Sequence, residues 1–319
     1  MGTIIEETVG GVVAEARDLV ETYVKAEVIE VTEPATGVAA LVIRAGNTVI
    51  PLSPGVFDPY RTEPLNRHGT ATMLSLASLI EHINRTKDDS SVIFADDDRS
   101  KPSIVAVLDY HHGGGLADAG SALELARFGK HRSAFAFPLS DEWKAWIENN
   151  AKPMDMVEFA AFLEERLPDV LALIPGEDVL SEDIGRMVDA LGGPDIIASP
   201  GRLMELSRGL QVNENSRVRE VVNLATGEGV VQWEATHTDE TGAPLRVPKV
   251  FLIGIPVFRN DGLYRIAARL RYRKREGGRI VFWYELWRTD RTFDHAFQMA
   301  VERVRVETDL PVLIGRPEA

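Results

Sequence analysis

The 319-residue chain contains no cysteine, and this absence removes several kinds of chemistry at once. Without a thiol there is no disulfide, no thiolate metal site and no cysteine nucleophile. The chain also lacks an uninterrupted apolar run of the roughly 18 to 20 residues that a membrane span requires. Its hydrophobic content of 45% is nevertheless high enough, at this length, to form a sizeable core. We therefore expect a globular protein without a membrane segment.

The N-terminus lacks the features of a secretory signal. A signal peptide begins with basic residues and continues with an apolar stretch. Residues 1–24 instead include four acidic side chains, Glu6, Glu7, Glu15 and Asp18. The absence of cysteine agrees with a reducing compartment. The expected location is therefore the cytoplasm.

Three motifs that would indicate an enzyme or a cofactor site are also missing. The chain has no Gly-x4-Gly-Lys-Ser/Thr phosphate loop and no Gly-x-Gly-x-x-Gly after a strand, so nucleotide hydrolysis and dinucleotide redox chemistry are not expected. His112 and the three glycines after it resemble the oxyanion-hole motif of esterases, but no Gly-x-Ser-x-Gly nucleophile elbow accompanies them. No cofactor is expected.

The strongest structural pattern in the sequence is the alternation of residues 264–273. One face of an extended chain would hold Tyr264, Ile266, Ala268, Leu270 and Tyr272. The other face would hold Arg265, Ala267, Arg269, Arg271 and Arg273. A period of two with apolar residues on one side is typical of a half-buried strand.

The segment that follows predicts a hairpin. Residues 279–287 are dense in β-branched and aromatic side chains, and residues 275–277 can form a bulged turn with Gly277 at a positive φ. In this register Leu270 pairs with Phe282. Arg269 then lies opposite Trp283, where a guanidinium can stack on an indole.

These patterns predict an α+β fold with a C-terminal antiparallel sheet, a covering helix, a helical middle segment and a mixed α/β N-terminal part. We expect four segments. They are an N-terminal arm with short strands and a proline-rich linker at 1–66, an α/β segment at 67–150, an acidic helical segment at 151–210, and an antiparallel β domain with a C-terminal helix at 211–319.

Local signals in the first half of the chain predict further elements. A strand is expected at 48–52 and an extended loop at 53–66, where prolines interrupt regular structure. Thr70 or Thr72 is predicted to cap a helix that runs to residue 84. Strands at 91–95 and 103–110 are expected to form a hairpin around a charged turn.

The second half begins with capped helices. Ser140 is the predicted N-cap of one helix and Ser199 of another, with helices at 155–167 and 177–191 between them. A last helix at 292–307 is expected to cover one face of the C-terminal sheet. Residues 311–314 fit an edge strand, because Pro311 cannot donate to a ladder.

A metal site is one alternative that the residues allow. Asp109 follows an apolar strand and is close in sequence to His111 and His112, and imidazole and carboxylate ligands suit Zn, Mn or Fe. Adjacent histidines point to opposite sides of an extended chain, so only one of the two could face such a site. A metal-dependent hydrolase at residues 109–115 therefore stays an alternative.

The net charge of −14 is unevenly distributed. Residues 259–279 contain seven arginines and one lysine against Asp261 and Glu276, a net charge of +6. Residues 151–195 contain eleven acidic side chains against three basic ones, a net charge of −8. Opposite patches on one chain can be two solvated faces, or they can complement each other between subunits. Arginines beside aromatic residues also suit single-stranded nucleic acid.

Five residues are the expected contacts for either kind of partner. They are Arg265, Arg269, Arg271, Arg273 and Trp283. The arginines supply positive charge for phosphates or carboxylates, and the indole supplies a platform on which a base or a guanidinium can stack.

Several segments resemble the YfdQ-like proteins of phages and prophages, an uncharacterised family. The matching residues are 107–111, 140–146, 158–164, 253–258 and 270–273, and the similarity runs from about residue 70 to the C-terminus. The resemblance implies a phage or prophage setting, and therefore the cytoplasm of a host cell. It implies no catalytic residue.

The interpretation that we favour from the sequence is a non-enzymatic binding protein that self-assembles into a homo-oligomer. In that prediction the arginine face of one subunit meets the acidic helices of a neighbour. A nucleic-acid-binding accessory protein and a metal-dependent hydrolase are the alternatives.

Overall fold

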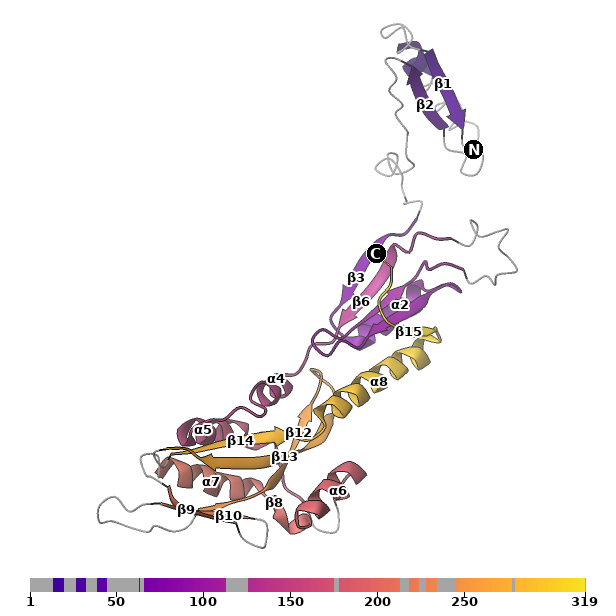
Figure 1. Cartoon of the computed structure of the whole chain (residues 1–319). Coiled ribbons are helices and arrows are strands. Elements are labelled where there is room, and N and C mark those ends of the chain that lie inside the picture. Colours follow the sequence, from indigo (N-terminus) through magenta and orange to yellow (C-terminus); the bar gives the residue numbers. More distant parts are fainter. Residues whose placement is uncertain are drawn as a thin grey trace. The chain divides into compact units, whose positions relative to one another are not determined.

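The protein is known from a computed structural model (Figure 1). The structure describes residues 14–19, 27–32, 39–44, 63, 66–112, 126–174, 178–212, 218–223, 228–233, 245–276 and 279–318. The chain divides into two compact units, Met1–His68 and Gly69–Ala319. The larger unit contains two five-stranded sheets and their helices.

In the smaller unit the described residues form one helical turn and one hairpin. Residues 14–19 are helical, and β1 (Glu27–Thr32) pairs with β2 (Ala39–Arg44) in antiparallel fashion. Both are short strands of the kind predicted for the N-terminal arm. The predicted strand at 48–52 lies outside the described residues, as does most of the loop predicted at 53–66.

The first sheet of the larger unit is mixed, in the order β15-β4-β5-β6-β3. Its strands are β3 (Gly69–Met73), β4 (Val92–Asp96), β5 (Ser103–Val107), β6 (His131–Ala136) and β15 (Val312–Ile314). The predicted hairpin of β4 and β5 is confirmed, and β15 is an edge strand as predicted, parallel to β4. Helix α2 (Leu76–Thr86) buries Leu79, Ile80 and Ile83.

The start of α2 differs from the prediction. Thr70 and Thr72 are strand residues in β3, which is parallel to β6, and the N-cap is Ser75, whose side chain accepts a hydrogen bond from the Ser78 N–H at 3.1 Å. Threonine has a high strand propensity, and β6 provides a ladder about sixty residues further along the chain. Pairing with the distant strand β6 therefore decided that residues 70–72 form a strand and not the start of a helix.

The second sheet has the order β14-β13-β12-β7, with β8 also paired to β12. Its strands are β7 (Val170–Leu171), β8 (Ile197–Ala198), β12 (Val250–Pro256), β13 (Leu263–Lys274) and β14 (Ile280–Leu286). One face packs in the main core with α4 (Asp141–Glu148) and α5 (Met156–Arg166). The largest fully buried side chains of this core are Trp146, Phe159, Phe251, Phe282 and Tyr284.

The hairpin of β13 and β14 forms as predicted, but in another register. Leu270 pairs with Tyr284 and not with Phe282, and Arg269 pairs with Glu285 and not with Trp283. The Arg275 N–H donates to the Arg279 carbonyl at 2.6 Å, so the loop is longer than the predicted turn. The register moves by two residues, and a shift of two leaves every side chain on its predicted face.

A second apolar cluster covers part of the other face of this sheet. Helix α6 (Glu182–Leu191) packs Ile184, Met187 and Val188 there against residues of β12 and β13. The predicted helix at 177–191 is therefore shorter than expected and begins after Ser181. Helix α7 (Pro200–Val212) contacts α5, and the Ser199 side chain accepts from the Arg202 N–H as predicted.

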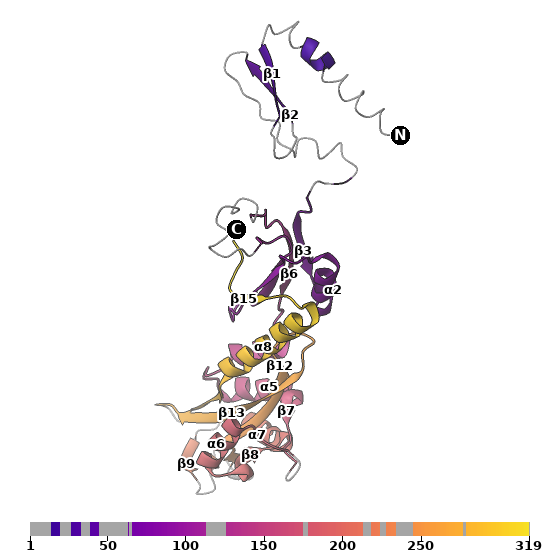
Figure 2. The ribbon, with the colours of Figure 1, turned by 90° about the vertical axis from the view of Figure 1, so that its right-hand side faces the viewer.

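The remaining elements complete the larger unit. Strands β9 (Val218–Asn223), β10 (Gly229–Trp233) and β11 (Leu245–Val247) form a three-stranded antiparallel sheet. Helix α8 (Thr289–Thr308) contacts both α2 and β13, and it runs from the second sheet to the first (Figure 2). The helix predicted at 292–307 is confirmed, and it buries Phe293, Ala296, Phe297 and Val304.

The fold class is α+β, as the sequence predicts. Among the described residues, no helix combines the length and the apolar character needed to cross a bilayer.

Candidate functional site

The arginine row predicted from the sequence lies on one face of β13. Arg265, Arg269, Arg271 and Arg273 occupy alternate positions of the strand. The register places Gly254 opposite Arg265, Val250 opposite Arg269 and Trp283 opposite Arg271. Trp283 is therefore on the same face as the arginines, but it lies opposite Arg271 and not opposite Arg269 as predicted. The structure thus brings together all five residues that the sequence analysis selected.

Two of these arginines bind carboxylates of the same chain, and the first is Arg265. It lies 2.6 Å from Asp178 and also donates to the Val179 carbonyl at 3.1 Å. The pKa of Asp178 lies below its usual range, because the Ile174 N–H and the Arg265 guanidinium both donate to its carboxylate. Asp178 belongs to the acidic segment that was predicted to meet the arginines of a neighbour.

Arg271 is the second, and its partner is on the adjacent strand. Its Nε lies 3.3 Å from Glu285 Oε2, and the Trp283 indole N–H donates to the other oxygen of Glu285 at 3.2 Å. Glu285 therefore holds both the guanidinium and the indole on the sheet face. Because these side chains are partly exposed, the contact fixes their geometry more than it stabilises the fold.

Arg269 lies between these two pairs. Glu285 lies opposite it on β14 but binds Arg271, so Arg269 makes no ion pair among the residues that the structure describes. It lines two cavities, which also share Leu191. We call the two together the arginine groove. The first has a volume of about 450 Å³ and lies where β12 begins, beyond which β13 is paired with β14 only. The second has a volume of about 320 Å³ and lies between α6 and the end of β14.

The arginine groove adds three charged side chains that the sequence analysis missed. Lys249 lines the first cavity, and Arg186 and Arg288 line the second. Trp287, an aromatic residue that the sequence places near the row, also lines the second cavity. The Arg288 guanidinium lies 5.5 Å from the centre of the Trp287 ring, a cation–π contact. No sequence signal joins Arg186 to the row, because it belongs to the acidic helix and reaches this site only through the packing of α6.

The charges around the groove are mostly positive. Lys249, Arg269 and Arg271 line the first cavity, and Arg186, Arg269 and Arg288 line the second. Asp183 is the acidic residue of the second cavity, and it already binds Arg291 at 2.7 Å and Arg186 at 3.4 Å. The groove can therefore attract an extended anion, and Arg269 can contact it without breaking an ion pair.

Two residues of the predicted metal site, Asp109 and His111, accept hydrogen bonds from backbone N–H groups. Asp109 accepts from the His131 N–H at 2.8 Å and the Lys130 N–H at 3.1 Å, so its carboxylate anchors the start of β6. His111 Nδ1 accepts from the Arg127 N–H at 3.0 Å, and His112 is exposed. Residues 113–115 lie outside the described part of the chain. Within that part no three potential ligands gather as a metal would require.

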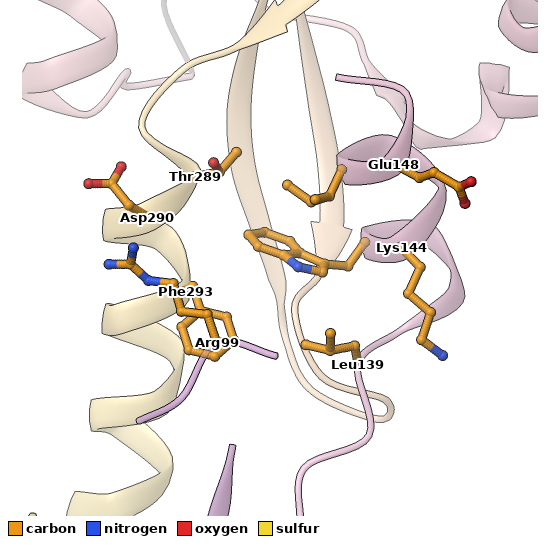
Figure 3. A pocket seen from close by; sticks show the side chains of 9 residues that line it. Arg99, Leu139, Lys144, Glu148, Thr289, Asp290 and Phe293 are labelled. Carbon is orange, nitrogen blue, oxygen red and sulfur yellow. The ribbon is translucent and has the colours of Figure 1, made fainter. Parts of the chain in front are cut away.

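A further cavity lies between α4 and the start of α8 (Figure 3). It has a volume of about 490 Å³, and Leu139, Trp143, Ile147 and Phe293 give it apolar walls. The charged side chains of Lys144, Glu148 and Asp290 point away from its centre (Figure 3).

Comparison with known proteins gives one informative result. A family model described as "Uncharacterized conserved protein (DUF2303)" matches residues 50–317. No curated protein and no solved structure matches the chain. The matched range includes both five-stranded sheets and the whole arginine groove.

Proposed function

Since the chain belongs to the DUF2303 family of uncharacterized conserved proteins, we propose a function from its own residues: it is a non-enzymatic protein that binds single-stranded nucleic acid in the arginine groove. A phage or prophage setting, with the host cytoplasm as the location, belongs to this proposal too. That setting is supported by the resemblance of the sequence motifs alone, whereas the binding function is supported by the groove.

The observation that carries the proposal is that Arg269 makes no ion pair among the described residues and is therefore available to a ligand. It is central in the row and lines both cavities of the groove. A guanidinium presents fixed donors that match phosphate oxygens, and it remains charged at every physiological pH. Cations on both sides of Arg269 would meet successive phosphates of one strand.

The aromatic side chains favour a single strand over a duplex. Trp283 is partly exposed on the same face as the row, and Glu285 holds its indole by a hydrogen bond. Unpaired bases can stack on such a ring, whereas bases inside a duplex cannot reach it. Because the whole chain has a net charge of −14, attraction must come from this local patch.

Fluorescence anisotropy with a labelled single-stranded oligonucleotide, across a range of salt concentrations, tests the proposal. Arg269→Gln, at the residue that lines both cavities, should weaken binding and reduce the slope of log K against log salt by ~0.7 for each phosphate that the variant no longer neutralises. Arg208→Gln is the matched control, because Arg208 is exposed on α7 and lines neither cavity. Wild-type protein that binds no oligonucleotide at low salt would refute the proposal, and so would an equal weakening in both variants.

Self-assembly through the arginine row stays a separate prediction. It requires that an acidic surface of a neighbouring subunit neutralises the positive charge of the arginine row. Asp178 and α6 contact this face within one chain, so part of that compensation is internal. Native mass spectrometry at low salt tests what remains: a particle larger than a dimer that shrinks on reversal of Arg269 and Arg271 to Glu would support it.

A further inference from the structure

The first sheet of the larger unit ends in a strand with an open edge. β3 is the last strand in the order β15-β4-β5-β6-β3 and, among the described residues, pairs with β6 on one side only. The Gly69 N–H donates to the Lys130 carbonyl at 2.8 Å, so the backbone groups of Gly69, Ala71 and Met73 face β6. The N–H and C=O groups of Thr70 and Thr72 therefore point away from the sheet.

Among the described residues, this edge carries no charged residue, proline or bulge that would protect it against pairing. Natural edge strands carry a charged residue, a proline or a bulge that prevents another strand from adding to them. The sequence from Gly69 to Leu74 is Gly-Thr-Ala-Thr-Met-Leu, and the pairing of β3 with β6 has no register shift. Thr70 and Thr72 are exposed, and Leu74 is 93% exposed. The surface is therefore uncharged, extended and open.

We propose that β3 pairs with β3 of a second copy of the chain, in antiparallel fashion, around a two-fold axis at Ala71. Thr70 of one copy then lies opposite Thr72 of the other, and each of the two threonine pairs exchanges both of its backbone hydrogen bonds. The two first sheets become one continuous sheet. The contact is isologous and closes at two copies, unlike a head-to-tail assembly.

The sequence of the edge identifies the partner as a second copy. Residues 70–72 read Thr-Ala-Thr in both directions, so antiparallel self-pairing brings like threonines together, and such pairs are favourable across strands. In this register Gly69 lies opposite the partner's Met73, at the ends of the strand. β3 contains no charged residue, so no two like charges meet within the paired strands.

The absence of cysteine allows a direct test. Ala71→Cys introduces the only thiol, and Cβ atoms of a directly opposed, non-hydrogen-bonded pair lie about 4.5 to 5.5 Å apart. Small backbone adjustments bring this within disulfide range. Under mild oxidation the variant should form an interchain disulfide on the order of ten times faster than Glu81→Cys, an exposed control on α2. Equal rates would overturn the proposal.

A second pair of variants tests the hydrogen bonds themselves. Thr72→Pro removes one outward N–H and leaves the bonds to β6 intact, and proline is tolerated on an edge strand. Thr72→Val keeps the N–H and the branched side chain. Native mass spectrometry should find dimers for wild type and Thr72→Val, and monomers for Thr72→Pro with an unchanged melting temperature.

Salt separates this dimer from a charge-driven assembly. At about 0.5 M salt, surface charges are largely screened but the strand pairing should persist. The proposal fails if wild type is monomeric at tens of micromolar, if Thr72→Pro stays dimeric, or if salt alone dissociates the dimer. An extended peptide of another protein that occupies the edge in place of a second copy would also overturn it.

Discussion

The assignment of the core can be tested most sharply at Leu270. This side chain is 5% exposed and lies in the main core, where its strand neighbour on β14 is the fully buried Tyr284. The adjacent residues Arg269 and Arg271 point to the other face of β13. Leu270→Asp would therefore place a carboxylate in the core, and its nearest neighbours on the same face of β13, Ala268 and Tyr272, carry no charge that could compensate it.

The expected cost follows from two effects. Removing a buried leucine side chain costs about 2 to 5 kcal/mol, depending on how far the site collapses. A buried carboxylate adds a desolvation cost or takes up a proton. We expect a decrease on the order of 3 kcal/mol or more in the free energy of unfolding. For a unit of this size each kcal/mol lowers the melting temperature by roughly 2 to 4 °C, so the fall should be at least about 6 °C.

Thermal unfolding followed by circular dichroism measures this change. Arg273→Asp is the matched control, because Arg273 is exposed on the same strand and receives the same new side chain. Substitutions at such surface positions usually change stability by about 0.5 kcal/mol or less. If Leu270→Asp remains folded and soluble with a melting temperature near that of Arg273→Asp, the placement of the core is wrong.

Three further predictions concern single side chains. Tyr284→Phe should lower the free energy of unfolding, measured by chemical denaturation, by about 1 to 2 kcal/mol. The buried hydroxyl donates to the Trp146 carbonyl at 2.7 Å, and the variant leaves that acceptor without this donor. An unchanged denaturation midpoint would contradict this prediction. Burial alone would raise the pKa of Asp88, but hydrogen bonds from Arg127 and Ser90 lower it to about 2, so Asp88 stabilises the fold above pH 3.8 and this contribution is lost as the pH falls towards 2. The melting temperature of Asp88→Asn should therefore lie below that of wild type at pH 7, and the two should converge in acid. The difference should be small, because the Asp88 side chain is 39% exposed. A difference that stays constant with pH would show that the charge of Asp88 is not responsible. His111→Asn should leave the metal content of purified protein unchanged, as measured by elemental analysis, and loss of a bound metal would instead favour the hydrolase alternative.

Local features of the chain were predicted well from the sequence. Ser140 and Ser199 bind the backbone N–H groups of the helices that follow them, and the alternation along β13 gave the correct faces. Caps and strand faces depend on residues within one or two turns of the chain. The five candidate contact residues share a face for the same reason, since the period of a strand decides it.

Features that depend on distant partners were predicted poorly. The register of β13 and β14 follows from a loop closed between Arg275 and Arg279, and β3 is a strand because β6 lies beside it. Arg186 joins the arginine groove only because α6 packs on the sheet. None of these contacts leaves a periodic signal in the sequence.

The sequence by itself determined the α+β class, the strand that bears the arginines and the absence of thiol chemistry. The tertiary structure decided which arginine can meet a ligand. Asp178 and Glu285 bind Arg265 and Arg271, whereas Arg269 faces two cavities and makes no ion pair among the described residues. The reason is physical: charge along a strand is local information, but compensation of that charge depends on which segments fold back over it.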